Sequence, residues 1–190
     1  MTENTSTPSL PSLAPDIRLF GPLDENMLSE FFRQQAEVPK EKPVVFELST
    51  SGGDADIGRR IAGELRLWQE HDRREVYFWG KTFVFSAGVT VMAAIPAARR
   101  FVTRDCELLI HERKLGKDIS LNGSLRSALT LLHDAIAQIE SGQRLEREGF
   151  AQLVEGTGLS LEKLQEKVFS RDWYVPAQEA LKLGLVAGIV

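Results

Sequence analysis

Residues 44–68 read VVFELSTSGGDADIGRRIAGELRLW. The apolar run at the start of this stretch is typical of a buried strand, and the pair Gly52-Gly53 is typical of a tight turn. From Ile57 to Trp68 an apolar residue returns at every third or fourth position, which predicts an amphipathic helix. The stretch therefore predicts a strand, a turn and a helix, which is the repeating unit of a parallel sheet covered by helices.

Similar patterns lie on both sides of this stretch. Strand-like segments are expected at 17–21, 75–80, 100–103, 107–111 and 184–190. Helical segments are expected at 24–38, 87–94, 159–168 and after Pro176. Because strands and helices alternate with short connections, the chain is predicted to be an α/β protein with a largely parallel sheet.

A longer helix is expected at about 123–156, after the polar connector 112–123. Its apolar residues recur every three or four positions and form one stripe, made of Leu125, Leu129, Leu132, Ile136 and Ile139. Because this helix lies outside the alternation of strands and helices, we expect it to project as a handle. The stripe would then be buried against another subunit. The alternative is that the stripe packs on its own domain.

Composition indicates one soluble domain. The chain has 190 residues, of which 43% are hydrophobic and 26% charged, and residues 16–190 are expected to share one core. Residues 1–15 are rich in Ser, Thr and Pro without periodicity, which predicts a flexible tail. The net charge of -4 gives no attraction to nucleic acid or to an anionic membrane. No apolar stretch approaches the roughly 18 residues of a membrane span, so a cytoplasmic location is expected.

Cysteine usage excludes two kinds of site. Cys106 is the single cysteine, so no internal disulfide can form and no second thiol supports a metal centre. It precedes an apolar run and is expected to be a small buried residue. No cofactor or metal is expected.

Ser86 stands where strand-like residues give way to the helix that starts at Ala87. Its hydroxyl could cap that helix, or it could be a nucleophile, since N–H groups at a helix start favour developing negative charge. A serine nucleophile needs a base. His71 lies in a charged run and His133 on the long helix, whereas His111 ends a strand at the edge where the glycine turn also lies. His111 is therefore the candidate base, although a hydrogen-bonded core histidine is an alternative.

Several motifs resemble, in the same order, those of ClpP, the proteolytic subunit of the Clp protease. They are Ser51-Gly52-Gly53, Ser86-Ala87-Gly88, Ile110-His111, Arg171-Asp172-Trp173-Tyr174, Glu179-Ala180 and Gly184-Leu185. The resemblance extends from about residue 17 to the end of the chain. It implies a ClpP/crotonase-type spiral of ββα units with a projecting long helix.

The resemblance also implies an active site. Ser86 would be the nucleophile, His111 the base, and Asp172 the carboxylate that fixes the tautomer of the imidazole. The N–H groups of Gly53 and Ala87 would form the oxyanion hole. The family's activity then implies a serine endopeptidase that hydrolyses polypeptides inside a homo-oligomer, as a ring or as stacked rings. The simpler alternative for Asp172 is a surface ion pair with the neighbouring arginine.

The chain also departs from the family's pattern. Thr82 stands in place of a glycine, and residues 114–118 replace the glycine-rich strand that aligns substrate. Val45 and Glu47 occupy positions of tyrosines that help to dock an AAA+ unfoldase, whereas Phe101 keeps an aromatic of that groove. An acidic Glu47 disfavours an apolar docking loop because burying its charge is costly. We therefore expect a divergent member in which delivery of substrate is altered and the usual ATPase partner is doubtful.

Three other functions stay open on the sequence. Acyl-CoA-binding enzymes of the crotonase superfamily share the spiral and use the same two-amide hole for enolates. A ClpP-like scaffold subunit without catalysis is a second alternative, motivated by the missing glycine-rich strand. A Ser-Lys dyad is the third, with Lys81 or Lys167 as the base.

Overall fold

We describe the computed structural model of the chain over residues 9–39 and 42–190. Its strands are β1 (Ile17–Phe20), β2 (Val44–Thr50), β3 (Val76–Phe85), β4 (Arg100–Val102), β5 (Glu107–Ile110), β6 (Trp173–Pro176) and β7 (Gly188–Ile189). They form one sheet in the order β1-β2-β3-β4-β7, with β5 paired to β3 and β6 paired to β5. Every pairing is parallel except that of β5 with β6. The predicted largely parallel sheet is confirmed.

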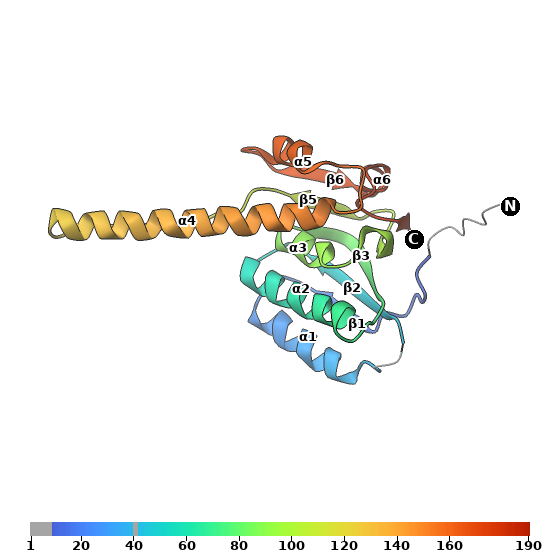
Figure 1. Ribbon diagram of the computed structural model, residues 1–190. Coiled ribbons are helices and arrows are strands. Elements are labelled where there is room, and N and C mark those ends of the chain that lie inside the picture. The colour runs from blue at the N-terminus through green and yellow to red at the C-terminus, as the bar shows by residue number, and fades with distance from the viewer. Residues whose placement is uncertain (1–8, 40–41) are drawn as a thin grey trace.

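The helices are α1 (Glu25–Glu37), α2 (Ala55–Glu70), α3 (Ala87–Ala93), α4 (Leu125–Val154), α5 (Leu161–Val168) and α6 (Ala177–Lys182), with a 3₁₀ turn η1 (Ala97–Arg99). α1 and α2 lie side by side over the sheet, and α3 lies between α2 and α4 (Figure 1). The main core fills the space between the sheet and these helices, and Phe31, Phe46 and Phe78 are fully buried there. Because successive strand residues point to opposite faces, Val45 falls instead in a smaller cluster with Trp79 and Phe101.

Two aspartates set where α1 and α2 begin. Asp24 Oδ1 accepts a hydrogen bond from the N–H of Met27 at 2.8 Å, and Asp54 Oδ1 accepts one from the N–H of Asp56 at 2.7 Å. A cap of this kind stabilises a helix by about 1 kcal/mol. The second cap starts α2 directly after the glycine turn, as the sequence predicts.

β3 changes partners along its length. Its first half pairs with β4, and its last residues, from Phe83 to Phe85, pair with β5. The strand bends between these halves at Thr82, whose φ of 57° is unusual for a β-branched residue. The resemblance to ClpP implies a glycine at this position. The bend brings the ends of β3 and β5 to the same edge of the sheet.

Arg100 anchors the base of α4 to the end of α3. Its side chain is buried, and it donates to the carbonyl oxygens of Ile95 at 2.6 Å and Leu153 at 2.9 Å. Burial lowers the pKa of this guanidinium from 12.5 to about 10, so it stays charged at neutral pH. A cation suits this place because the carbonyl ends of two helices meet there.

α4 projects beyond the rest of the molecule (Figure 1). Its 30 residues make it about 45 Å long. Its last turns, around Phe150 and Leu153, are buried on the domain, and Ala135 is buried farther out along the helix. The stripe from Leu125 to Ile139 is exposed, with 86% of Leu125 accessible. The stripe therefore does not pack on its own domain.

Other differences from the predicted elements are local. β6 was not predicted as a strand, and the strand expected at 184–190 is reduced to β7, because Gly184 turns the chain with a φ of 73°. Residues 9–15 of the predicted tail contain neither helix nor strand, whereas 1–8 lie outside the described residues. Among the described helices, none has both the length and the apolar character that a membrane crossing requires.

Candidate active site

Ser86 occupies the sharp junction between β3 and α3. Its backbone has φ 56° and ψ -119°, a rare conformation for a residue with a side chain, and its N–H donates to the carbonyl of Leu109 at 2.8 Å. The side chain forms no capping hydrogen bond with α3. The interpretation of Ser86 as a helix cap is therefore wrong. Its hydroxyl lies at the start of α3 but accepts no hydrogen bond from the N–H groups of that helix.

Glycines make this junction possible. A Cβ on Gly52 would lie 2.8 Å from Ser86 Cβ and 3.4 Å from Ser86 Oγ. A Cβ on Gly88 would overlap the methyl group of Thr50. The glycine turn after β2 thus lies directly against the serine, and α3 packs closely on the end of β2.

The two predicted oxyanion donors are present and unused. The N–H of Leu23 donates to the carbonyl of Gly52, and the carbonyl of Leu23 accepts from the N–H of Asp54, both at 2.8 Å. Neither bond uses the N–H of Gly53. Within the described residues, the N–H groups of Gly53 and Ala87 donate to no protein acceptor. Neither N–H group is therefore occupied by a hydrogen bond within the fold, and Ala87 lines the same cavity as Ser86.

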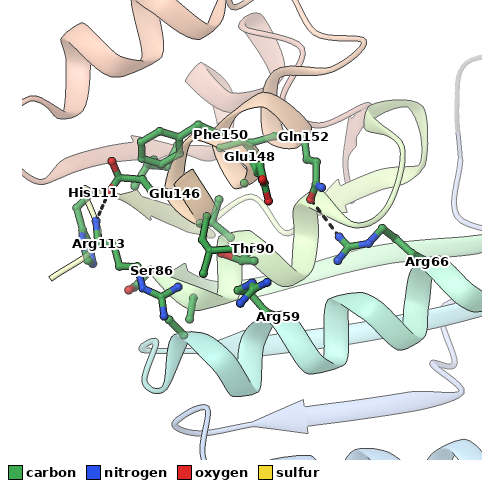
Figure 2. A pocket seen from close by; sticks show the side chains of 17 residues that line it. Arg59, Arg66, Ser86, Thr90, His111, Arg113, Glu146, Glu148, Phe150 and Gln152 are labelled. Carbon is green, nitrogen blue, oxygen red and sulfur yellow. Dashed lines mark hydrogen bonds between the residues drawn. The ribbon is translucent and has the colours of Figure 1, made fainter. Parts of the chain in front are cut away.

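His111 follows the last residue of β5. Its Nδ1 lies 2.5 Å from the backbone oxygen of Glu112. Because a carbonyl oxygen can only accept, Nδ1 must carry the proton, which leaves Nε2 of a neutral imidazole free to accept another. His111 and Ser86 line the same cavity of about 140 Å³ (Figure 2), but no hydrogen bond joins them in the described part of the chain.

Asp172 lies near His111 but bonds elsewhere. The antiparallel register of β5 and β6 ends with the pair Ile110 and Trp173, and His111 and Asp172 are the next residues beyond that pair. His111 and Asp172 line one cavity, together with Lys114. In the structure, however, Asp172 Oδ1 contacts Lys114 Nζ at 3.2 Å.

The loops that carry His111 and Asp172 are nonetheless joined. Glu112 Oε2 accepts a hydrogen bond from the N–H of Ser170 at 2.9 Å. Arg171 bonds to backbone carbonyls of α5 and not to Asp172, so the interpretation of a simple Arg171–Asp172 pair is wrong. The backbone therefore brings the histidine and the aspartate together. The side-chain hydrogen bonds of a triad are not formed among Ser86, His111 and Asp172 in this structure.

Sequence reasoning missed the charged wall of the cavity beside Ser86. Arg59 and Arg66 of α2 and Arg113 of the connector all line it (Figure 2). The spacing of seven residues between Arg59 and Arg66 places them on one helix face, and this spacing was the available signal. Arg113 contacts Asp56 at 3.0 Å and thereby lowers the pKa of that carboxyl below its usual range.

Neither lysine of the alternative dyad faces this cavity. Lys81 Nζ lies 2.7 Å from Glu47 Oε2 and 3.7 Å from the centre of the Trp79 ring. Lys167 Nζ lies over the ring of Trp173, 5.5 Å from its centre. The structure thus gives no support to either lysine as the base.

The remaining candidates lie away from the site. His71 and His133 are exposed, as expected. Cys106 is buried, and burial raises the pKa of its thiol from 9.0 to about 12. The prediction of a small buried cysteine is confirmed. Among the described residues no cluster of three His, Cys, Asp or Glu side chains is arranged to hold a metal.

The chain is similar over most of its length to known proteolytic subunits of the Clp protease. The family model for Clp protease matches residues 14–190. Proteolytic subunit 2 of the ATP-dependent Clp protease of Treponema pallidum is 27% identical over 92% of this chain and 81% of its own length. Proteolytic subunit 3 of that protease from Rhizobium etli is 24% identical over 92% of this chain and 82% of its own.

A solved structure confirms the predicted fold. A mutant of ClpP1 from Listeria monocytogenes superimposes with a TM-score of 0.68 and covers 92% of this chain and 90% of its own, at 17% sequence identity. Together with the sheet and helices described above, this match confirms the expected ClpP/crotonase-type α/β fold with its long helix.

Proposed function

Since the chain belongs to the Clp protease family, we propose that it is a serine endopeptidase with Ser86 as nucleophile, His111 as general base and Asp172 as the carboxylate behind the histidine. The single observation that carries the proposal is the state of Ser86. Its backbone is strained at a strand-to-helix junction, its hydroxyl serves no cap, and it shares a cavity with His111. Strain of this kind costs about 1–3 kcal/mol and is typical of functional residues.

The chemistry follows from the free nitrogen of His111. Nε2 takes the proton of Ser86 Oγ as that oxygen attacks the peptide carbonyl, and it then delivers the proton to the leaving amine. The N–H groups of Gly53 and Ala87 stabilise the oxyanion, where one such donor typically contributes about 10²–10³ in rate. A water molecule activated by the same nitrogen releases the acyl group and restores the serine.

Asp172 completes the mechanism by moving from Lys114 to His111. Until it does so, the Glu112 carbonyl holds the same tautomer that a carboxylate would hold, but it bears no full charge to stabilise the imidazolium. The Lys114–Asp172 pair is largely exposed, so breaking it is inexpensive. We therefore expect the closed triad to form when substrate fills the cavity.

The projecting helix supports a proposal about assembly. The stripe of α4 and the apolar residues of the connector, Leu115, Ile119 and Leu121, are exposed together. We propose that another copy of the chain covers them in a cytoplasmic homo-oligomer, as a ring or as stacked rings. Polypeptides would be the substrates. Glu47 is engaged by Arg18 at 3.1 Å and by Lys81, which disfavours docking of an apolar unfoldase loop at this position.

The experiment is covalent labelling combined with peptide cleavage. Purified protein should be labelled by a fluorophosphonate at Ser86 and should cleave short fluorogenic peptides, whereas Ser86→Ala should do neither. His111→Ala should lower kcat by about 10²–10⁴, the usual contribution of a general base. His133→Ala, on the exposed part of α4, is the matched control and should leave kcat unchanged.

Each alternative predicts a different result. Absence of both labelling and cleavage would support the scaffold subunit and overturn the proposal. Full activity in His111→Ala would favour a lysine base. Micromolar binding of a simple acyl-CoA without peptide cleavage would favour the crotonase-type function. Mass determination in solution tests the assembly, and a monomer at all concentrations would contradict it.

A further inference from the structure

The cavity beside Ser86 is strongly charged at one end. It runs from Ser86 and His111, past Thr90, to Arg66 at the far end, with Arg59 between them (Figure 2). Its volume of about 140 Å³ is close to the 150 Å³ that holds a benzene-sized group. The cavity is therefore large enough for one substrate side chain.

Some of the charges in this cavity are already compensated. Arg113 forms an ion pair with Asp56 at 3.0 Å. The carboxylate of Glu146 accepts a hydrogen bond from the backbone N–H of Arg113. These contacts hold the connector against α2 and α4, and Arg113 already has a carboxylate partner in Asp56.

The other two arginines of the wall have weaker partners. Arg66 donates to Gln152 at 3.0 Å, and no carboxylate contacts it within the part of the chain described. Arg59 lies 3.5 Å from Asp56, which already has the closer partner in Arg113. Glu148 is the one acidic side chain of the wall without a bonded partner among the described residues. Arg59 and Arg66 therefore present two guanidinium groups to the cavity, which also has the carboxylates of Glu146 and Glu148 in its wall.

The rest of the wall suits the stem of a polar side chain. Val89, Ile110, Leu145 and Phe150 supply apolar surface to the same wall. Thr90 lies in the middle of these lining residues (Figure 2). A ligand side chain with a few methylene groups and a terminal carboxylate would suit this wall. Its methylene groups would be buried against these residues, and its carboxylate would reach the guanidinium groups.

We propose that this cavity binds an acidic side chain, so that the enzyme cleaves peptides after glutamate in preference to leucine or lysine. The inference rests on the proposed function of Ser86. An apolar side chain of the same size would fill the space but displace water from Arg59 and Arg66 without replacing its hydrogen bonds, which is unfavourable. A lysine side chain would meet two like charges.

The test is the ratio of kcat/KM for peptides that differ only at the residue before the scissile bond. Glutamate should exceed leucine by about tenfold, the factor that corresponds to 1.4 kcal/mol. In Arg66→Gln this ratio should fall about tenfold, and Arg66→Glu should favour lysine over glutamate. Glu148→Gln should change the ratio in the opposite direction, since it removes the competing carboxylate.

Arg60→Gln is the matched control, because Arg60 is the next arginine on α2 but pairs with Glu64 outside the cavity. Its ratio should equal that of the wild type. Should the full chain be labelled at Ser86 but turn over slowly, peptide aldehydes ending in glutamate, leucine or lysine can be ranked by how well they block fluorophosphonate labelling.

Failure of the inference and failure of the proposed function give different results. Labelling of Ser86 together with a leucine peptide that matches or exceeds the glutamate peptide overturns the acidic preference alone. An unchanged ratio in Arg66→Gln also overturns it. Absence of both labelling and cleavage for every peptide overturns the proposed function, and the specificity with it.

Discussion

Replacing Lys114 with methionine should raise peptidase activity. In the structure Lys114 Nζ holds Asp172 Oδ1 at 3.2 Å, although Asp172 and His111 line one cavity just beyond the last pair of β5 and β6. With the lysine gone, the carboxylate loses its competing partner and spends more time on the imidazole. Methionine keeps the length of the side chain but removes the charge.

The size of the effect follows from the exposure of the ion pair. The side chains of Lys114 and Asp172 are 71% and 39% accessible, and pairs of this kind contribute about 0.2–1 kcal/mol. Releasing that energy shifts the aligned population by about 1.4- to 5-fold, since 1.36 kcal/mol corresponds to a factor of ten. We therefore expect kcat to rise by this factor while KM stays within error.

Salt provides a second readout of the same contact. At about 1 M salt the screening length is roughly 3 Å, so the Lys114–Asp172 attraction should be weak and wild-type kcat should approach that of Lys114→Met. Lys117→Met is the matched control, because Lys117 bonds to Gln138 and not to Asp172. The reasoning is refuted if Lys114→Met is no faster than wild type, or if Lys117→Met is accelerated to the same extent.

Three further predictions concern the scaffold of the site. Gly52→Ala should fold but lose about 10²-fold in kcat/KM, because a Cβ there lies 2.8 Å from Ser86 Cβ; Gly63→Ala, with open space around it, should keep full activity. Arg100→Met should lower the free energy of unfolding in urea by about 2–5 kcal/mol, because buried carbonyls lose their donor, and a loss below about 1 kcal/mol would contradict this anchor. Native Cys106 should resist thiol reagents until urea unfolds the chain. The pKa of the Cys106 thiol is about 12 in the folded state and 9.0 in the unfolded state, so the unfolded state loses the thiol proton at lower pH. The free energy of unfolding should therefore fall as the pH rises from 9 to 12, and it should fall less steeply in Cys106→Ala.

The elements with a regular apolar period could be predicted from the sequence. β2, α2 and α4 lie close to their predicted bounds because long apolar runs or stripes leave few alternatives. β6 was missed because only Val175 of its four residues is buried, so no apolar run marks it. Its existence depends on pairing with β5, which is far away in the sequence.

The backbone of the site was likewise more predictable than its side-chain contacts. Ser86 is fixed by the bend of β3 at Thr82 and by close packing against Gly52, and these buried contacts tolerate little variation. Asp172 is different, since its partner is chosen among exposed groups whose interactions differ by about 1 kcal/mol or less. A residue pattern can identify a position that only one conformation satisfies, but it cannot rank lysine against histidine as the partner of an exposed carboxylate. For the same reason the contacts that close the proposed triad are the ones most easily changed by substrate, salt or a single substitution.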